Sequence, residues 1–93
     1  MNRIDRMRAA LDAAFTPTFL QIDDDSHLHA GHAGARSGRG HYRVEIVSTR
    51  FAGLALLARH RAVYEALGEL MTTEIHALSI RAHAPDEVPI KPA

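Results

Sequence analysis

The fold is decided by residues 41–70, which read HYRVEIVSTRFAGLALLARHRAVYEALGEL. In the first eight of these residues, Tyr42, Val44 and Ile46 alternate with polar side chains, and this pattern predicts a half-buried strand over 41–48. A turn at 49–53 follows, and apolar residues at helical spacing then predict a helix over about 54–70. The predicted inward stripe of this helix consists of Leu56, His60, Val63, Leu67 and Leu70, widened by Leu57, Tyr64 and Met71.

The segment before this stretch supplies a helix, a strand and a long loop. Apolar spacing predicts an amphipathic helix over 2–15, with Asn2 as its N-cap and Thr16-Pro17 as its end. Alternation over 18–24 predicts a strand that turns Leu20 and Ile22 toward the core. Residues 26–40 are rich in glycine and histidine, which predicts a loop of a length that is often functional.

The segment after this stretch supplies the last strand. Gly68 weakens the end of the preceding helix, so we expect a break or a short additional helix there. Residues 75–83 alternate again, and the alternation places His76 with Leu78 and Ile80. A lone histidine in such a position is more often a core or edge residue than a ligand.

These elements predict an α+β domain with the order α-β-β-α-α-β. A helical connection between the second and third strands makes those two strands parallel, while the first two form an antiparallel hairpin. We therefore expect a three-stranded mixed sheet with the helices packed on one face. The predicted domain covers residues 1–85, and the proline-rich residues 86–93 are predicted to be a disordered tail.

The composition excludes several classes of protein. The 93 residues include no cysteine and seven histidines, and 11 basic residues balance 11 acidic ones. Without cysteine there is no disulfide framework, no thiol nucleophile and no iron–sulfur cluster held by thiolates of this chain alone. Zero net charge argues against strong nonspecific binding of nucleic acid. No stretch approaches the ~20 apolar residues of a membrane span, and the sequence indicates a cytoplasmic protein.

Histidines are the residues most suited to bind a metal. His27, His29 and His32 lie within six residues on the glycine-rich loop, and His41 follows it. Imidazole is a ligand for zinc, iron, copper and nickel. The spacing matches no rigid metal motif, so a polar loop with incidental histidines is an alternative interpretation. His76 joins these candidates because a loop from the hairpin could reach the start of its strand.

The Arg59-His60-Arg61 triplet is a second candidate site. His60 lies on the predicted apolar stripe, so we expect it to be buried with a hydrogen bond. Arg59 and Arg61 flank the stripe and are candidates to bind a phosphate or an acidic partner. A solvated helix face is an equally good interpretation. The serines lie in no nucleophile motif, and nothing in the sequence requires an enzyme.

Three strings of this sequence resemble the BolA-like proteins: SHLHAGHAG, the block GHYRVEIVSTRFAGLALLARHRAVYEALGELM, and EIHALSIRA. The resemblance covers about residues 2–87. It implies a type II KH-like fold of the order α-β-β-α-α-β, in agreement with the order predicted from periodicity. It also implies a protein that is not an enzyme.

The resemblance further implies a partner and a metal centre. BolA-like proteins pair with monothiol glutaredoxins and share a [2Fe-2S] cluster, whose remaining ligands are a glutaredoxin cysteine and glutathione. The family's ligand on the last strand corresponds to His76. Its ligand in the loop between the first two strands corresponds to His29, with His27 and His32 as competing or helping residues. On this interpretation the isolated chain binds no cluster.

The alternative function implied by the resemblance is a DNA-binding transcriptional regulator. Its candidate contacts are Arg59, Arg61 and Arg81. KH domains clamp RNA through a GXXG loop between helices, but the segment between the two predicted helices here has Gly68 and no GXXG, and the turn at 51–54 does not supply one either, which argues against RNA binding. The balanced net charge makes DNA the weaker of the two interpretations.

Overall fold

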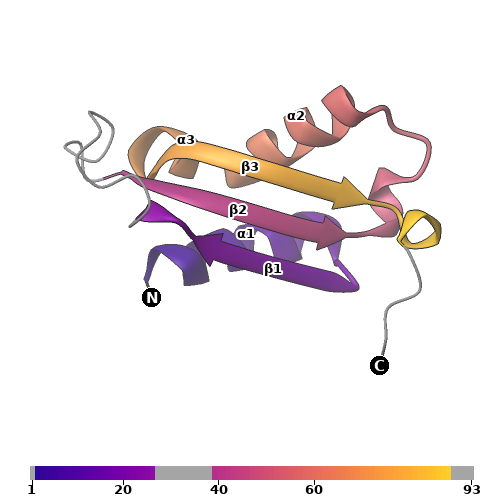
Figure 1. The fold of residues 1–93 in the computed structure, drawn as a ribbon, viewed down its shortest axis with the longest axis horizontal. Helices are drawn as coiled ribbons and strands as arrows, with labels where there is room; N and C mark the ends of the chain where they lie inside the picture. The colour runs from indigo at the N-terminus through magenta and orange to yellow at the C-terminus, as the bar shows by residue number, and fades with distance from the viewer. Residues whose placement is uncertain (1, 27–38, 89–93) are drawn as a thin grey trace.

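The computed structural model of the chain describes residues 2–26 and 39–88. Its regular elements, in chain order, are α1 (Arg3–Phe15), β1 (Phe19–Asp24), β2 (Gly40–Val47), η3 (Thr49–Phe51), α2 (Leu56–Leu67), α3 (Leu70–Thr73), β3 (Ile75–His83) and η4 (Pro85–Glu87). Figure 1 shows the three strands side by side. The predicted order α-β-β-α-α-β is confirmed, and the predicted break after residue 67 falls at Gly68, whose φ of 55° ends α2.

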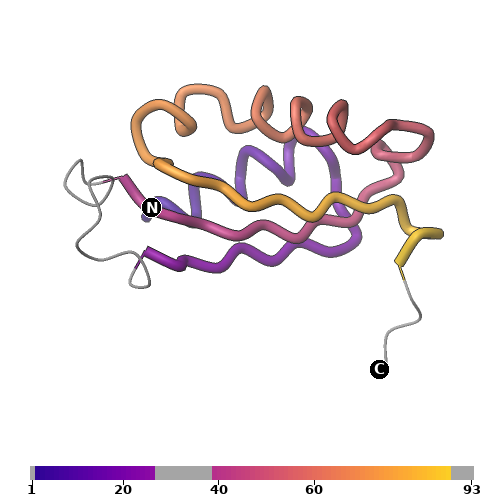
Figure 2. Tube along the Cα trace, turned by 45° about the horizontal axis from the view of Figure 1, so that its top comes forward, coloured from indigo at the N-terminus to yellow at the C-terminus, as the bar shows by residue number. Residues whose placement is uncertain are grey.

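The sheet has the order β1-β2-β3 and is mixed, as predicted. β1 and β2 are antiparallel, with Phe19 opposite Val47 and Asp24 opposite Tyr42. β2 and β3 are parallel. Figure 2 follows the chain from β2 through α2 and α3 back to the start of β3, and this crossover is what makes the two strands parallel.

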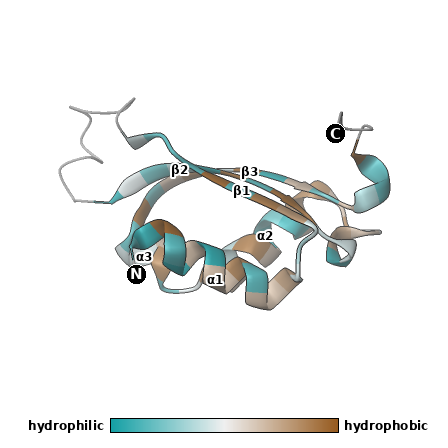
Figure 3. Ribbon diagram, turned by 90° about the horizontal axis from the view of Figure 1, so that it is seen from below, coloured by the Kyte–Doolittle hydropathy of each residue, from teal (hydrophilic) through white to brown (hydrophobic). Residues whose placement is uncertain are grey.

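The helices cover one face of the sheet and leave the other open (Figure 3). The core between the two layers consists of Met7, Leu11, Phe15, Ile22, Tyr42, Val44, Ile46, Phe51, Val63, Leu67, Ile75 and Ala82. Both strand predictions for the hairpin are confirmed, because Ile22 of β1 and Tyr42 of β2 are buried with these side chains. The open face carries the alternate, mostly polar residues of the same strands.

The inward face of α2 differs from the predicted stripe. Arg59, Val63 and Leu67 are buried, whereas Leu56, Leu57 and Tyr64 are exposed. His60 is half-buried rather than buried. Helix α2 is therefore rotated about its axis so that Arg59, rather than Leu56 and Leu57, faces the interior.

Arg59 is buried because the fold satisfies its charge and its hydrogen bonds. Its guanidinium donates to the backbone oxygens of Leu54 and Ala82 at 2.8 and 3.0 Å and forms a two-pronged ion pair with the Glu87 carboxylate. The second prong, from Nη2 to Oε2, measures 2.7 Å. The packing thus continues through η4, two residues past the predicted domain end at residue 85. Residues 89–93 of the predicted tail lie outside the described residues.

This ion pair predicts a dependence of stability on pH. The hydrogen bond from Arg59, helped by one from the Ala84 backbone N–H, lowers the pKa of Glu87 from 4.5 to about 2. Because the folded state holds the proton less tightly than the unfolded state, the stabilisation is complete above pH 4.5 and is lost as the pH falls toward 2. In urea titrations we expect Glu87→Gln to be less stable than the parent chain at neutral pH. This difference should shrink across that acid range, and a difference that stays constant would contradict the ion pair.

Candidate functional site

One end of the sheet brings together the end of β1 and the starts of β2 and β3. β1 ends there because it is antiparallel to β2, and β3 begins there because it is parallel to β2. Ser26 and Arg39, which flank residues 27–38, lie at the same end: Ser26 Oγ accepts from the His41 backbone N–H at 3.1 Å, and Arg39 reaches the Thr72 carbonyl. This end of the sheet carries His41 and His76.

A bulge in β3 sets the direction of His76. Gly40 pairs with Ile75 but the next residue, His41, pairs with Ala77, so His76 is the extra residue. Ile75 is only 1% exposed, whereas His76 is exposed. The predicted shared parity of His76 with the inward Leu78 is therefore wrong, because the bulge interrupts the alternation and turns the imidazole outward.

The two histidines at this end of the sheet form a pair. The ring centroids of His41 and His76 lie 5.1 Å apart, with 54° between the ring planes. His41 is half-buried. Within residues 2–26 and 39–88, no three histidine or acidic side chains gather closely enough to hold a metal ion. The described part of the site therefore offers two imidazoles, and the other ligands of a metal bound there are not side chains of the described residues.

The start of β3 is anchored by an ionic network that no local sequence pattern marks. The Glu74 carboxylate accepts from Arg3 Nε at 3.0 Å and from Arg6 Nη2 at 2.6 Å. The hydrogen bond from Arg3 is the main reason why the pKa of Glu74 is lowered. Arg3 also donates to the Tyr42 hydroxyl, and the Glu74 carbonyl accepts from Gly40 N–H at 2.9 Å. Helix α1 thus fixes the residue two positions before His76.

Gly40, the β2 residue that precedes His41, has no room for a side chain. A Cβ atom there would lie 2.6 Å from the Tyr42 hydroxyl and 2.7 Å from Ser26 Oγ. We expect Gly40→Ala to lower the free energy of unfolding by about 2 kcal/mol, because overpacking forces the buried Tyr42 ring to shift. Urea denaturation followed by circular dichroism measures this loss. An unchanged free energy would contradict the close approach.

The other predicted site residues lie apart from this pair or outside the description. His27, His29 and His32 fall within the residues that the structure leaves undescribed. Arg59, which was predicted to flank the apolar stripe, lies on the buried face of α2 instead, and its guanidinium is engaged by Glu87. Arg61 is exposed on α2, on the helical side of the sheet, whereas Arg81 lies on the open face.

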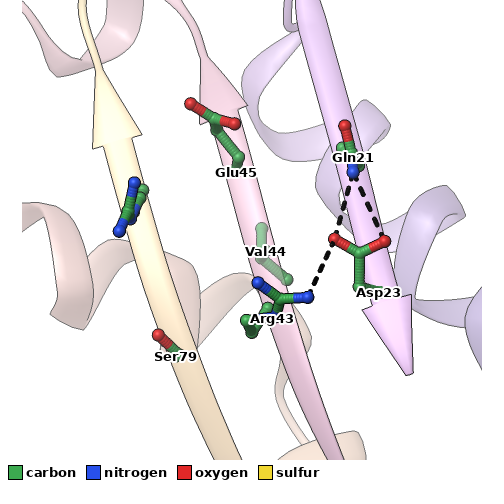
Figure 4. Close-up of a pocket in the computed structure, with 7 residues that line it drawn as sticks. Gln21, Asp23, Arg43, Val44, Glu45 and Ser79 are labelled. Atoms are coloured by element: carbon green, nitrogen blue, oxygen red, sulfur yellow. Dashed lines mark hydrogen bonds and ion pairs between the residues drawn. The ribbon is translucent and has the colours of Figure 1, made fainter. Parts of the chain in front are cut away.

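The open face has a polar hollow that spans the three strands (Figure 4). Its lining includes Gln21, Asp23, Arg43, Glu45, Ser79 and Arg81. Arg43 is shared between two carboxylates, at 2.6 Å from Asp25 and 4.0 Å from Asp23. Charges of both signs thus alternate across the hollow, so it is not a uniformly basic surface.

The described geometry is that of a small α+β domain with one open, mostly polar sheet face. At one end of this face, the exposed imidazole of His76 lies beside that of His41. A family profile described as "BolA-like protein" matches residues 11–87. The chain belongs to the BolA-like protein family. None of the helices within the described residues is long and apolar enough to cross a membrane.

Curated relatives and solved structures agree with this assignment. "Protein BOLA1, chloroplastic" of Arabidopsis thaliana is 45% identical over 93 residues, which cover 97% of this chain and 58% of that protein. The "DNA-binding transcriptional regulator BolA" of Escherichia coli is 40% identical over 79 residues, 85% of this chain and 72% of that protein. The structure of BolA1 from Arabidopsis thaliana matches with a TM-score of 0.83 at 42% identity, over 96% of this chain and 99% of that one.

A third similarity is to a domain within a larger protein. The BolA domain of SufE1 from Arabidopsis thaliana matches with a TM-score of 0.84 at 39% identity, over 95% of this chain and 98% of that one. The chain spans only 58% and 24% of the first two curated relatives, Protein BOLA1 and SufE-like protein 1. Because both are named as organellar proteins, the expected cytoplasmic location stays a prediction.

Proposed function

We propose that this chain is a non-enzymatic adaptor that binds a monothiol glutaredoxin and shares a [2Fe-2S] cluster with it, in iron–sulfur cluster trafficking or iron sensing. The observation that carries the proposal is the outward imidazole of His76, which a bulge directs onto the open face at the anchored end of the sheet. An exposed imidazole on an anchored strand is suited to bind a metal centre that is shared with a second protein.

The chemistry of the available side chains fits a shared site. Imidazole replaces thiolate on one iron of Rieske-type [2Fe-2S] centres and raises their reduction potential. This chain has no cysteine, so the thiolates of such a centre come from the glutaredoxin cysteine and glutathione. His76 is the proposed ligand on the described part of the chain. His29 stays the predicted loop ligand, with His27 and His32 as helpers.

Anaerobic reconstitution tests this proposal. The chain is mixed with a monothiol glutaredoxin, glutathione, ferric iron and sulfide, and the absorption and circular dichroism spectra are recorded. We expect a spectrum that differs from that of the glutaredoxin's own cluster-bridged homodimer, because imidazole replaces a thiolate on one iron. A spectrum identical to that of the homodimer would contradict the proposal. Calorimetry of the same two proteins without iron identifies pairing that needs no cluster.

DNA binding is the second candidate, favoured by the name of the Escherichia coli relative. Because Arg59 is buried, the remaining candidates to contact DNA are Arg61, on the helical side of the sheet, and Arg81, on the open side. Fluorescence anisotropy with labelled duplex DNA across a salt series tests it. Binding that survives competitor DNA and weakens on Arg61→Ala would support a DNA-binding role. Binding that disappears at physiological salt would contradict it.

A further inference from the structure

We propose that His41 and His76 together bind one divalent transition-metal ion of the zinc class on this chain alone. The site needs no partner protein and is therefore distinct from the shared cluster proposed above. It consists of two neutral imidazoles, with water completing the coordination of the ion.

The separation of the two rings suits a common ion. Zinc binds imidazole nitrogen at about 2.0–2.1 Å, and the ring centre lies roughly 1 Å beyond that nitrogen, so two imidazoles on a tetrahedral ion have centroids about 5 Å apart. The centroids of His41 and His76 lie 5.1 Å apart. The angle of 54° between the planes excludes a parallel stack, in which ring faces rather than ring nitrogens would meet.

The backbone holds the two rings in place before any ion arrives. His41 lies on β2 and pairs with Ala77, the residue after His76 on the hydrogen-bonded neighbouring strand. The start of β3 is tied to α1 through Glu74, as described above. Little conformational freedom of the backbone is therefore lost on binding, and this improves the affinity of a site with only two protein ligands.

The surroundings of the pair determine which ion fits. Asp25 and His41 line a second hollow, separate from that of Figure 4, and Asp25 is ion-paired there to Arg43 at 2.6 Å. A site of nitrogen ligands and water favours zinc, nickel or copper over magnesium and calcium, which prefer oxygen ligands. This second hollow has a volume of about 300 Å³, which leaves room beside the His41 ring for water molecules. An ion held there would withdraw His76 from any other metal centre.

Calorimetric titration with zinc chloride tests the site in a His27→Ala, His29→Ala, His32→Ala background, which removes the competing loop histidines. We expect one zinc ion per chain and at least tenfold weaker binding after His41→Ala or His76→Ala. His60→Ala is the matched control and should bind zinc like the background. Absence of zinc binding in the background would overturn the proposal, as would binding that survives both substitutions.

Nuclear magnetic resonance of the imidazole nitrogens provides a second readout, in which His41 and His76 themselves are unchanged. On addition of zinc to the same background, the ring nitrogen signals of His41 and His76 should shift together, while those of His60 and His83 stay in place. A shift of only one of the two signals, or of neither, would overturn the two-imidazole site. His41→Phe keeps an aromatic ring at the position and should still lose zinc binding, which separates ligation from folding.

Discussion

The Arg59→Met variant is expected to unfold with a free energy about 3 kcal/mol below that of the parent chain, because it leaves buried backbone oxygens without a donor. The parent guanidinium donates to the carbonyls of Leu54 and Ala82 and pairs with Glu87. Methionine fills a similar volume but donates no hydrogen bond. Urea denaturation followed by circular dichroism measures the loss.

Arg61→Met is the matched control for this prediction. Arg61 is two residues further along α2 and is exposed, so its replacement should change stability by no more than about 0.5 kcal/mol. Arg59→Lys should recover only part of the stability, because one ammonium group does not reproduce the planar fork that serves three acceptors. Equal losses in Arg59→Met and Arg61→Met would contradict the structural role of Arg59.

The second large effect is expected at His76. In the reconstituted complex with glutaredoxin, His76→Ala should reduce the mixed cluster's distinct circular dichroism signal by about tenfold or more, because the loss of a ligand weakens the site at least as much as the loss of a supporting residue. His60→Ala, which removes a half-buried histidine of α2, is the control and should leave the signal unchanged.

A conservative replacement separates ligation from folding at this position. His76→Cys offers a thiolate in place of the imidazole, so the complex should still hold the cluster but with a lower reduction potential. Loss of the cluster in His76→Cys together with a normal signal in His76→Ala would contradict the assigned role of His76.

Much of the fold could be predicted from hydrophobic periodicity and from the residues that end helices and strands. Alternation in 41–48 placed Tyr42 and Ile46 in the core, and Gly68 marked the end of α2, because both signals are local. The crossover rule then fixed the parallel pairing of β2 and β3. These predictions needed no knowledge of distant contacts.

The errors arose where distant contacts overrule local pattern. Hydropathy predicts that an arginine lies on the outside of a helix. Arg59 is buried nevertheless, because two backbone carbonyls accept its hydrogen bonds and Glu87 pairs with its charge. The partner Glu87 lies in a proline-rich segment whose composition alone predicts disorder. The outward direction of His76 depends on a bulge, and strict alternation does not anticipate an inserted residue.

The residues of the site could be predicted, but the contacts between them could not, because those contacts join distant parts of the chain. His76 could be named from the resemblance to the BolA-like proteins, and His41 from its place beside the loop. Their pairing at 5.1 Å needs the register of β2 against β3, which the sequence does not contain. The anchoring of Glu74 by Arg3 and Arg6 joins residues that are 71 and 68 positions apart in the sequence, and nothing local marks it.

Nitrogen hyperfine spectroscopy tests the central claim most directly. Only this chain is labelled with a heavy nitrogen isotope in its histidines, and the complex with unlabelled glutaredoxin is reconstituted, reduced and examined by electron paramagnetic resonance. The account predicts strong hyperfine coupling from the labelled nitrogen, with the His76 contribution missing in the His76→Ala complex. A reduced cluster in the complex without coupling to labelled nitrogen would contradict the claim that this chain ligates the cluster.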